Sequence, residues 1–242
     1  MYVNTSVVWE SLSTSDRKQK FDVYSFVGYN SVIANFEYSP TKDYRTLLQD
    51  IQDQSSLKIY GKIMILPKTQ KDLKNALKNV NSFSDFLIGV SSLDKDILTM
   101  GIKDSRVDVI SFPNIQDLDN VTSGIISLLK THEKFLEISF RDVLRSSKHE
   151  RSRLFHDIDK FLGVVSANTQ ILLYGGCERS IVEIRGPREI ATIFTAIFNL
   201  PLQTSKKIVQ SNPERLINIL QERISPNHYS HGVKIISQPN KE

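Results

Sequence analysis

Short runs of apolar, β-branched or aromatic residues recur along this 242-residue chain, with polar stretches of helical character between them. Their starts lie 21 to 36 residues apart, the length of a strand, a turn, a helix and a return loop. Several runs are almost continuously apolar, which is typical of parallel strands covered on both faces. The repeating unit is therefore a strand followed by a helix. The runs are Tyr2–Val8, Val32–Tyr38, Lys58–Leu66, Phe86–Ser91, Val107–Phe112, Phe135–Phe140 and Ile171–Tyr174.

Seven such units can form an open doubly wound sheet or a closed barrel. The even spacing favours the barrel, as does the absence of a G-x-G-x-x-G turn after any strand. A candidate eighth strand, Ile181–Ile184, is short and is followed at once by Gly186 and Pro187, so we expect an irregular closure there. The sequence predicts a single α/β domain over residues 1–224, an irregular TIM-like βα barrel of about seven parallel strands, and a mobile tail over 225–242.

Helix start signals support this layout. Ser147 with Glu150 three residues later is a capping box ahead of a helical apolar pattern. Pro187 and Pro213 each stand where the first turn of a helix tolerates proline. We expect the chain to close with two helices packed on the last strands, and Leu200, Leu202, Ile208 and Val209 are candidates there for a protein interface or for core packing.

The composition excludes several site types. The single cysteine, Cys177, leaves no disulfide framework, Cys-based zinc cluster or CxxC pair, and it fits a reducing cytoplasm. No stretch approaches the roughly 18 apolar residues of a membrane span, and the N-terminus does not resemble a signal peptide. We therefore expect a cytoplasmic protein that does not contact the membrane.

Catalytic groups of a TIM-like enzyme gather at the C-terminal ends of the strands. Here those ends offer few carboxylates and no histidine, and the first strand lacks a His-x-His pair. A metal-dependent phosphoesterase of the PHP-like barrel class, which needs several His and Asp ligands, stays open as the alternative. The residues expected at the strand ends are Glu10, Glu37, Lys68, Ser91, Ser92, Asn114, Arg141 and Cys177.

Basic residues are more concentrated than the net charge of +4 suggests. Residues 141–153 hold five cations against two carboxylates, where a strand end leads into a capped helix that could meet phosphates. A solvated helix face is the competing interpretation. The candidate RNA-binding residues are Arg141, Arg145, Lys148, Arg151 and Arg153, then Arg185 and Arg188, and a third group of Lys103 and Arg106. Aromatic residues are not interleaved with them, so docking on the backbone of a folded RNA fits better than single-strand binding.

Four ordered motifs resemble one known family. They are RVDVISFP at Arg106–Pro113, FLEISFRDVL at Phe135–Leu144, IRGPREI at Ile184–Ile190 and SNP at Ser211–Pro213. Together with the spacing of the strands, they resemble the ribonuclease P protein component 3 family, shared by archaeal and eukaryotic enzymes, over about residues 1 to 222.

The resemblance implies a barrel related to metal-dependent phosphoesterases but without their metal site. It implies a noncatalytic subunit that binds no cofactor itself, while the ribonuclease P RNA uses magnesium ions to cut the 5′ leader from precursor tRNA. It also implies a heterotetramer with ribonuclease P component 2. The holoenzyme would further contain components 1 and 4 and a kink-turn-binding ribosomal-type protein.

Overall fold

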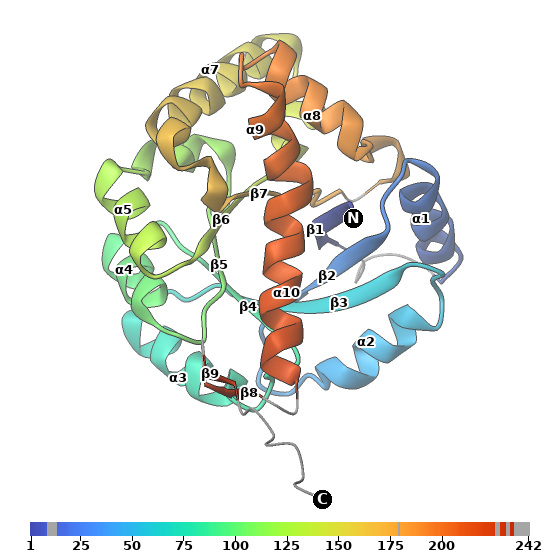
Figure 1. The fold of residues 1–242 in the computed structure, drawn as a ribbon, viewed down its shortest axis with the longest axis vertical. Coiled ribbons are helices and arrows are strands. Elements are labelled where there is room, and N and C mark those ends of the chain that lie inside the picture. The colour runs from blue at the N-terminus through green and yellow to red at the C-terminus, as the bar shows by residue number, and fades with distance from the viewer. Residues whose placement is uncertain (9–13, 179, 226–227, 231–232, 235–242) are drawn as a thin grey trace, which may run out of the picture.

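The computed structural model describes residues 1–8, 14–178, 180–225, 228–230 and 233–234. Seven parallel strands follow one another in chain order and form a nearly closed barrel with helices around it (Figure 1). Each strand pairs with the next one along the chain, which is the consequence of a repeated strand-helix unit. The strands are β1 (Val3–Val7), β2 (Ser31–Glu37), β3 (Lys58–Ile65), β4 (Leu87–Ser91), β5 (Val109–Ser111), β6 (Phe135–Ile138) and β7 (Leu172–Tyr174).

The α-helices lie outside the strands, and polar residues fix where several of them begin. Asp43 caps one helix by accepting hydrogen bonds from two backbone N–H groups, and Thr69 forms a capping box with Asp72. The α-helices are α1 (Thr14–Phe26), α2 (Tyr44–Gln52), α3 (Gln70–Val80), α4 (Lys95–Lys103), α5 (Ser123–Thr131), α6 (Arg141–Arg145), α7 (Lys148–Val165), α8 (Pro187–Ala196), α9 (Leu202–Lys206) and α10 (Asn212–Ile224). Shorter helical turns are Ile115–Asn120, Ser166–Ile171, Ile181–Glu183 and the π-helical Lys207–Ser211.

The predicted start signals at Ser147 and Pro187 are confirmed, whereas Pro213 follows a π-helical turn without a break in the helix. The Ser147 backbone N–H donates to Glu150 Oε2 at 3.0 Å at the start of α7, and Pro187 opens α8. Ile181–Glu183 is a 3₁₀ turn rather than an eighth strand. The ladder therefore ends at β7, as the short and interrupted pattern there predicts.

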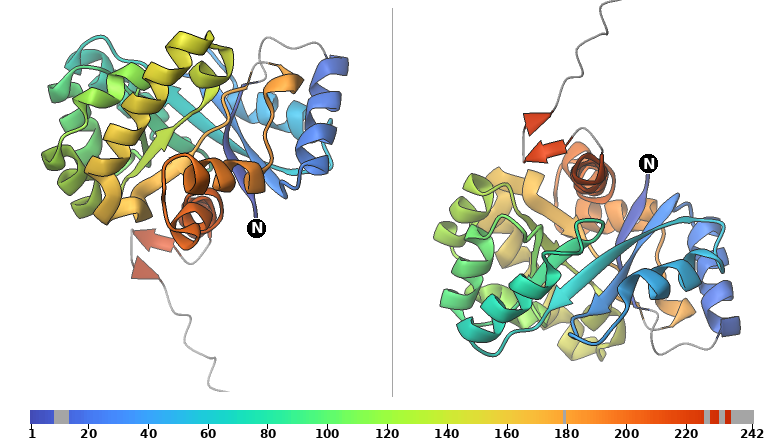
Figure 2. Two further views of the ribbon diagram at one scale, coloured as in Figure 1. Left: turned by 90° about the horizontal axis from the view of Figure 1, so that it is seen from above. Right: turned by 90° about the horizontal axis from the view of Figure 1, so that it is seen from below.

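The last helices cover two different parts of the barrel. α8 packs outside the last strands, where the ring of Phe194 lies 5.2 Å from that of Phe140, which in turn lies 5.4 Å from Tyr174. α10 instead crosses the N-terminal end of the barrel. Figure 2 shows the barrel from the side, with α10 lying across this end. The expectation that both helices pack on the last strands is therefore incomplete, because α10 closes the end of the barrel.

The sequence predicts a mobile tail over residues 225–242, and most of these residues lie outside the part of the chain that the structure describes. The described ones form two short antiparallel strands, β8 (His228–Ser230) and β9 (Val233–Lys234). Among the described helices, none is long and apolar enough to cross a membrane.

Candidate functional site

The inside of the barrel is built in layers, because every second side chain of a strand points inward. The layer nearest the N-terminal ends is apolar and packs against Leu216, Ile217 and Leu220 of α10. This layer closes one end of the barrel and leaves the other end, where the strands finish, as the open mouth. Its strand residues, one from each strand, are Val3, Ile33, Tyr60, Leu87, Val109, Phe135 and Leu173.

The next inward layer is polar. Lys62 from β3 and Glu137 from β6 are almost fully buried and form an ion pair across the interior. The Lys62 ammonium also donates to the Thr5 carbonyl oxygen at 2.8 Å. A buried charge of either sign is costly unless it is paired, so these two residues depend on each other. The inward positions of this layer, two residues beyond those of the apolar layer, are Thr5, Asn35, Lys62, Gly89, Ser111, Glu137 and Gly175.

Two glycines after β7 leave room for buried carboxylates. A Cβ on Gly175 would lie 1.9 Å from Glu137 Oε1, and one on Gly176 would lie 2.0 Å from Glu178 Oε2. Neither position can carry a side chain unless the carboxylate moves. The Gly-Gly pair is therefore required by the close approach of backbone and carboxylates, rather than by a left-handed conformation.

The barrel closes through individual hydrogen bonds between β1 and the segment after β7. The Thr5 hydroxyl donates to the Tyr174 carbonyl at 2.9 Å, and the Gly176 N–H donates to Asn4 Oδ1 at 2.9 Å. The Cys177 N–H donates to the Ser6 carbonyl at 2.7 Å. These bonds take the place of a ladder between the first and last strands.

A buried polar cluster supports this closure from outside β1. The Glu178 carboxylate accepts from the Tyr24 hydroxyl at 2.8 Å and from Asn4 Nδ2, and the Lys20 ammonium donates to the Glu178 carbonyl oxygen. Burial raises the pKa of Glu178 and lowers that of Lys20 to about 8. Burial, together with the Glu178 charge, raises the pKa of Tyr24 well above its ordinary value. The cluster joins α1, β1 and the segment after β7.

The barrel mouth contains a hollow of about 360 Å³. Of the residues expected at strand ends, Glu37, Ser91, Asn114, Arg141 and Cys177 line it. Lys68 and Ser92 do not: Lys68 is exposed, and the Ser92 hydroxyl accepts from the Asp94 N–H ahead of α4. Glu10 lies outside the described residues. Burial raises the pKa of the Cys177 thiol, which works against a nucleophilic role at neutral pH.

Most of the predicted RNA-binding residues gather near this mouth. Residues 141–153 form α6 and the start of α7, directly after β6. Arg145 forms a bidentate ion pair with Glu183, at 2.7 and 2.9 Å, and so joins this segment to the one carrying Arg185 and Arg188. We call these seven cations the basic arc: Arg141, Arg145, Lys148, Arg151, Arg153, Arg185 and Arg188.

The cations of the basic arc differ in what already binds them. Arg141 and Arg145 are paired with carboxylates, Asp142 and Glu183. The guanidinium groups of Arg151 and Arg185 donate to backbone carbonyls, and neither forms an ion pair with a described carboxylate. Within the part of the chain that the structure describes, Lys148, Arg153 and Arg188 are exposed and have no ion pair.

The third predicted group lies elsewhere. Lys103 ends α4 and Arg106 precedes β5, so both stand toward the N-terminal ends of the strands. Arg106 is held by Asp104 at 2.7 Å and by the Leu77 carbonyl at 2.9 Å. The structure therefore separates Lys103 and Arg106 from the basic arc.

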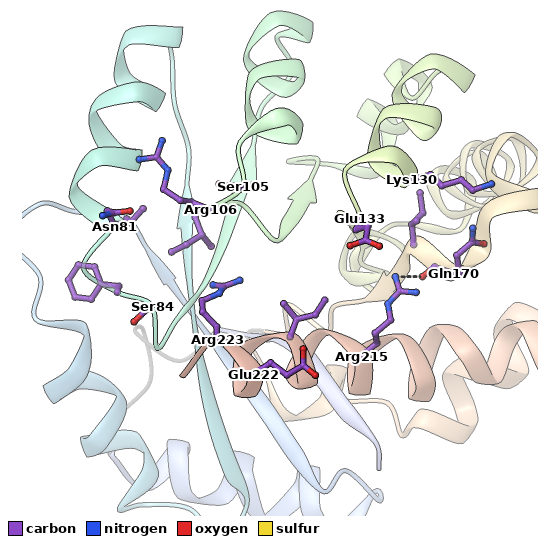
Figure 3. Close-up of a pocket in the computed structure, with 15 residues that line it drawn as sticks. Asn81, Ser84, Ser105, Arg106, Lys130, Glu133, Gln170, Arg215, Glu222 and Arg223 are labelled. Carbon is purple, nitrogen blue, oxygen red and sulfur yellow. Dashed lines mark hydrogen bonds between the residues drawn. The ribbon is translucent and has the colours of Figure 1, made fainter. Parts of the chain in front are cut away.

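Arg106 belongs instead to a groove of about 640 Å³ beside α10. Figure 3 shows the side chains of Arg106, Arg215 and Arg223 around this groove. The Arg215 guanidinium lies 4.5 Å from the centre of the Phe135 ring and donates to the Gln170 carbonyl, while Arg223 is paired with Asp108. The sequence reasoning missed Arg215 and Arg223, although their spacing of eight residues places them on one face of a helix.

Comparison with known proteins identifies the family. The sequence pattern of the family described as RNase P subunit p30 matches residues 1–225. The chain belongs to this family. It is thus a protein subunit of ribonuclease P, which processes the 5′ end of tRNA, and the phosphoesterase alternative is not favoured. Among the described residues, no three His, Cys, Asp or Glu side chains are placed to share a metal ion.

Solved structures place this RNase P subunit among TIM-like barrels. A chain from the cryo-EM structure of archaeal ribonuclease P with mature tRNA is 16% identical, with a TM-score of 0.79 over 99% of this chain and all of that one. The phosphotriesterase homology protein from Escherichia coli is 9% identical, with a TM-score of 0.59 over 88% of this chain and 97% of that one. A Xaa-Pro dipeptidase is 9% identical, with a TM-score of 0.60 over 91% and 75%. No curated protein sequence matches the chain.

Proposed function

We propose that this subunit supports the catalytic RNA of ribonuclease P while that RNA, with magnesium ions, removes the 5′ leader from precursor tRNA. The membership in the p30 family carries the proposal. The chemistry of the barrel mouth agrees with it, because two of its carboxylates are already committed to cations of this chain, Glu137 to Lys62 and Asp142 to Arg141. The chain itself holds no cofactor in this proposal.

The basic arc is the proposed RNA-binding surface. Lys148, Arg153 and Arg188 carry it, because they are exposed and no carboxylate of the described residues forms an ion pair with them. Arg145 acts by a different route: its bidentate pair with Glu183 holds the two halves of the arc together. Lys103 and Arg106, on the other end of the barrel, form a separate and weaker candidate surface.

The test replaces three cations of the basic arc at once. K148A/R153A/R188A should lower the salt dependence of RNA binding by about two to three units of slope, because each lost phosphate contact removes ~0.7–0.9. The matched control is K71A/K74A/K78A, which removes three exposed lysines from α3. Reconstituted cleavage of precursor tRNA at low magnesium should fall for the first variant and not for the second. An equal salt slope for both variants would show that the arc is only a solvated face.

The proposed partners are the ribonuclease P RNA, component 2, components 1 and 4 and a kink-turn-binding ribosomal-type protein, in the cytoplasm. Component 2 would join this chain in a heterotetramer, which light scattering of the mixed proteins measures directly. Of the apolar residues expected at a protein interface, Ile208 and Val209 are buried in the core and Leu202 is exposed. L202D should therefore weaken the heterotetramer if α9 contributes to it.

A further inference from the structure

Asn35 stands in the polar layer of the barrel with an unsatisfied side chain. It lines the hollow of the mouth from β2, and its Oδ1 atom is buried without a hydrogen-bond partner in the described part of the chain. Leaving a buried amide oxygen unpaired destabilises the folded state, and native proteins contain few such groups. A hydrophobic residue would fill this position at lower cost, so Asn35 needs an explanation beyond folding.

Other lining residues indicate a built site. Ser6, which is 1% exposed, and Cys177 line the same hollow and add polar groups to it. Met64, Phe112 and Pro113 add apolar walls to the same hollow. A volume of about 360 Å³ lies at the small end of the range for ligand sites, ~300–1,000 Å³. The hollow therefore has room for one small group that forms hydrogen bonds with the polar lining and contacts the apolar walls.

The charges exclude a phosphate inside the hollow. Lys62 compensates Glu137, and Arg141 compensates Asp142, while the carboxylate of Glu37 has no cation partner in the described structure. The Glu37 carboxylate therefore leaves the hollow with one surplus negative charge, and the lining offers more oxygen atoms that accept hydrogen bonds than groups that donate them. Such a site favours an uncharged ligand that donates N–H groups.

We propose that the barrel mouth captures a single unstacked adenine base, with the Asn35 amide reading its edge. An amide pairs with adenine through two hydrogen bonds, accepting from the exocyclic amino group and donating to a ring nitrogen. Because Oδ1 is closed off from solvent in the structure, the Asn35 side chain must turn toward the hollow when the base enters. Met64 and Phe112 would contact the faces of the base, as apolar side chains do for bases taken out of a stack. The phosphate stays outside the hollow, toward Arg141 and the basic arc.

The base can come from an unpaired adenosine of the ribonuclease P RNA or from a free adenosine nucleotide. The RNA source rests on the proposed function, whereas binding of the free nucleotide does not. The decisive variant is Asn35→Leu, which keeps the volume and removes the amide. Because Oδ1 has no hydrogen-bond partner among the residues that the structure describes, this variant should fold with unchanged or higher thermal stability. Asn75→Leu, at an exposed position of α3, is the matched control.

The first arm titrates the full chain with AMP, GMP, CMP and UMP and follows the backbone NMR signals. AMP should shift signals of the mouth, and N35L should weaken this binding by at least tenfold. The second arm probes the ribonuclease P RNA with dimethyl sulfate. An unpaired adenosine should be protected by the wild type and by N75L but exposed with N35L.

The outcomes separate the two proposals. The inference is overturned if the wild type and N35L bind AMP equally well. It is also overturned if no nucleotide binds and the bound RNA shows no protection that depends on Asn35. Either result leaves the proposed function standing. If AMP binds through Asn35 but the chain does not bind the RNA at all, the site is supported for a free nucleotide and the proposed function fails.

Discussion

Replacing Lys62 by methionine should destabilise the barrel far more than the loss of one surface charge. The substitution keeps an unbranched side chain of similar length and leaves Glu137, which is 5% exposed, as a charge without a partner inside the barrel. Removing one partner of a buried ion pair costs about 3–5 kcal/mol. For a chain of this size 1 kcal/mol corresponds to about 2–4 °C, so K62M should lower the melting temperature by roughly 10 °C.

Urea denaturation followed by circular dichroism measures the free energy of unfolding for each variant. The double variant K62M/E137L should recover most of the loss, because it removes both charges and leaves apolar side chains. K58M makes the same chemical change at an exposed position of the same strand, where the ammonium lies 5.0 Å from the centre of the Tyr60 ring, and should stay within about 1 kcal/mol of the wild type. A K62M protein as stable as K58M would refute the idea that the interior pair is desolvated, and so would a double variant no better than K62M.

Three further predictions concern the parts that hold the barrel closed. G175A should be strongly destabilised or fail to fold, because its Cβ would lie 1.9 Å from a Glu137 oxygen; the melting temperature and soluble yield report this. Lys20 has a pKa of about 8 when folded and 10.5 when unfolded, so the unfolded chain binds more protons between these values. Stability should therefore rise with pH from 8 to 10 more steeply in the wild type than in K20M, and identical slopes in denaturation curves would contradict this. R223M should cost about 2 kcal/mol by breaking the pair with Asp108 that fastens the end of α10, and it should raise hydrogen exchange there while leaving the barrel mouth unaffected.

The repeated strand-helix pattern is enough to predict most of the fold. The boundaries of the seven apolar runs coincide with those of the seven strands to within two residues, and Ile181–Glu183 does not pair as an eighth. A strand buried on both faces reads as a continuous apolar run, which is why the signal is strong. The path of α10 could not be predicted this way. Its apolar face shows that the helix is covered, but not whether it packs beside the strands or across their N-terminal ends.

The interior polar layer was missed for a related physical reason. Lys62 and Glu137 each stand inside a largely apolar run, and an isolated charge there looks like an exception rather than a partner. Their pairing depends on the barrel bringing β3 and β6 to face each other across the interior. A lysine or glutamate at an inward position of a buried strand was the available signal, since such a charge is seldom left unpaired.

The basic residues illustrate what sequence distance conceals. Arg145 and Glu183 are far apart along the chain, yet their ion pair joins two predicted groups into one surface, while Arg106 is separated from both.

The arrangement of the two ends of the barrel gives this surface its significance. In the described part of the chain, α10 and the apolar layer close the N-terminal end, and the polar interior opens at the mouth, beside the basic arc. Arg141 belongs to both the lining of the mouth and the arc. An RNA backbone held by the arc would therefore pass the hollow in which Asn35 is unsatisfied, and a base can be read there without the phosphates leaving their cations.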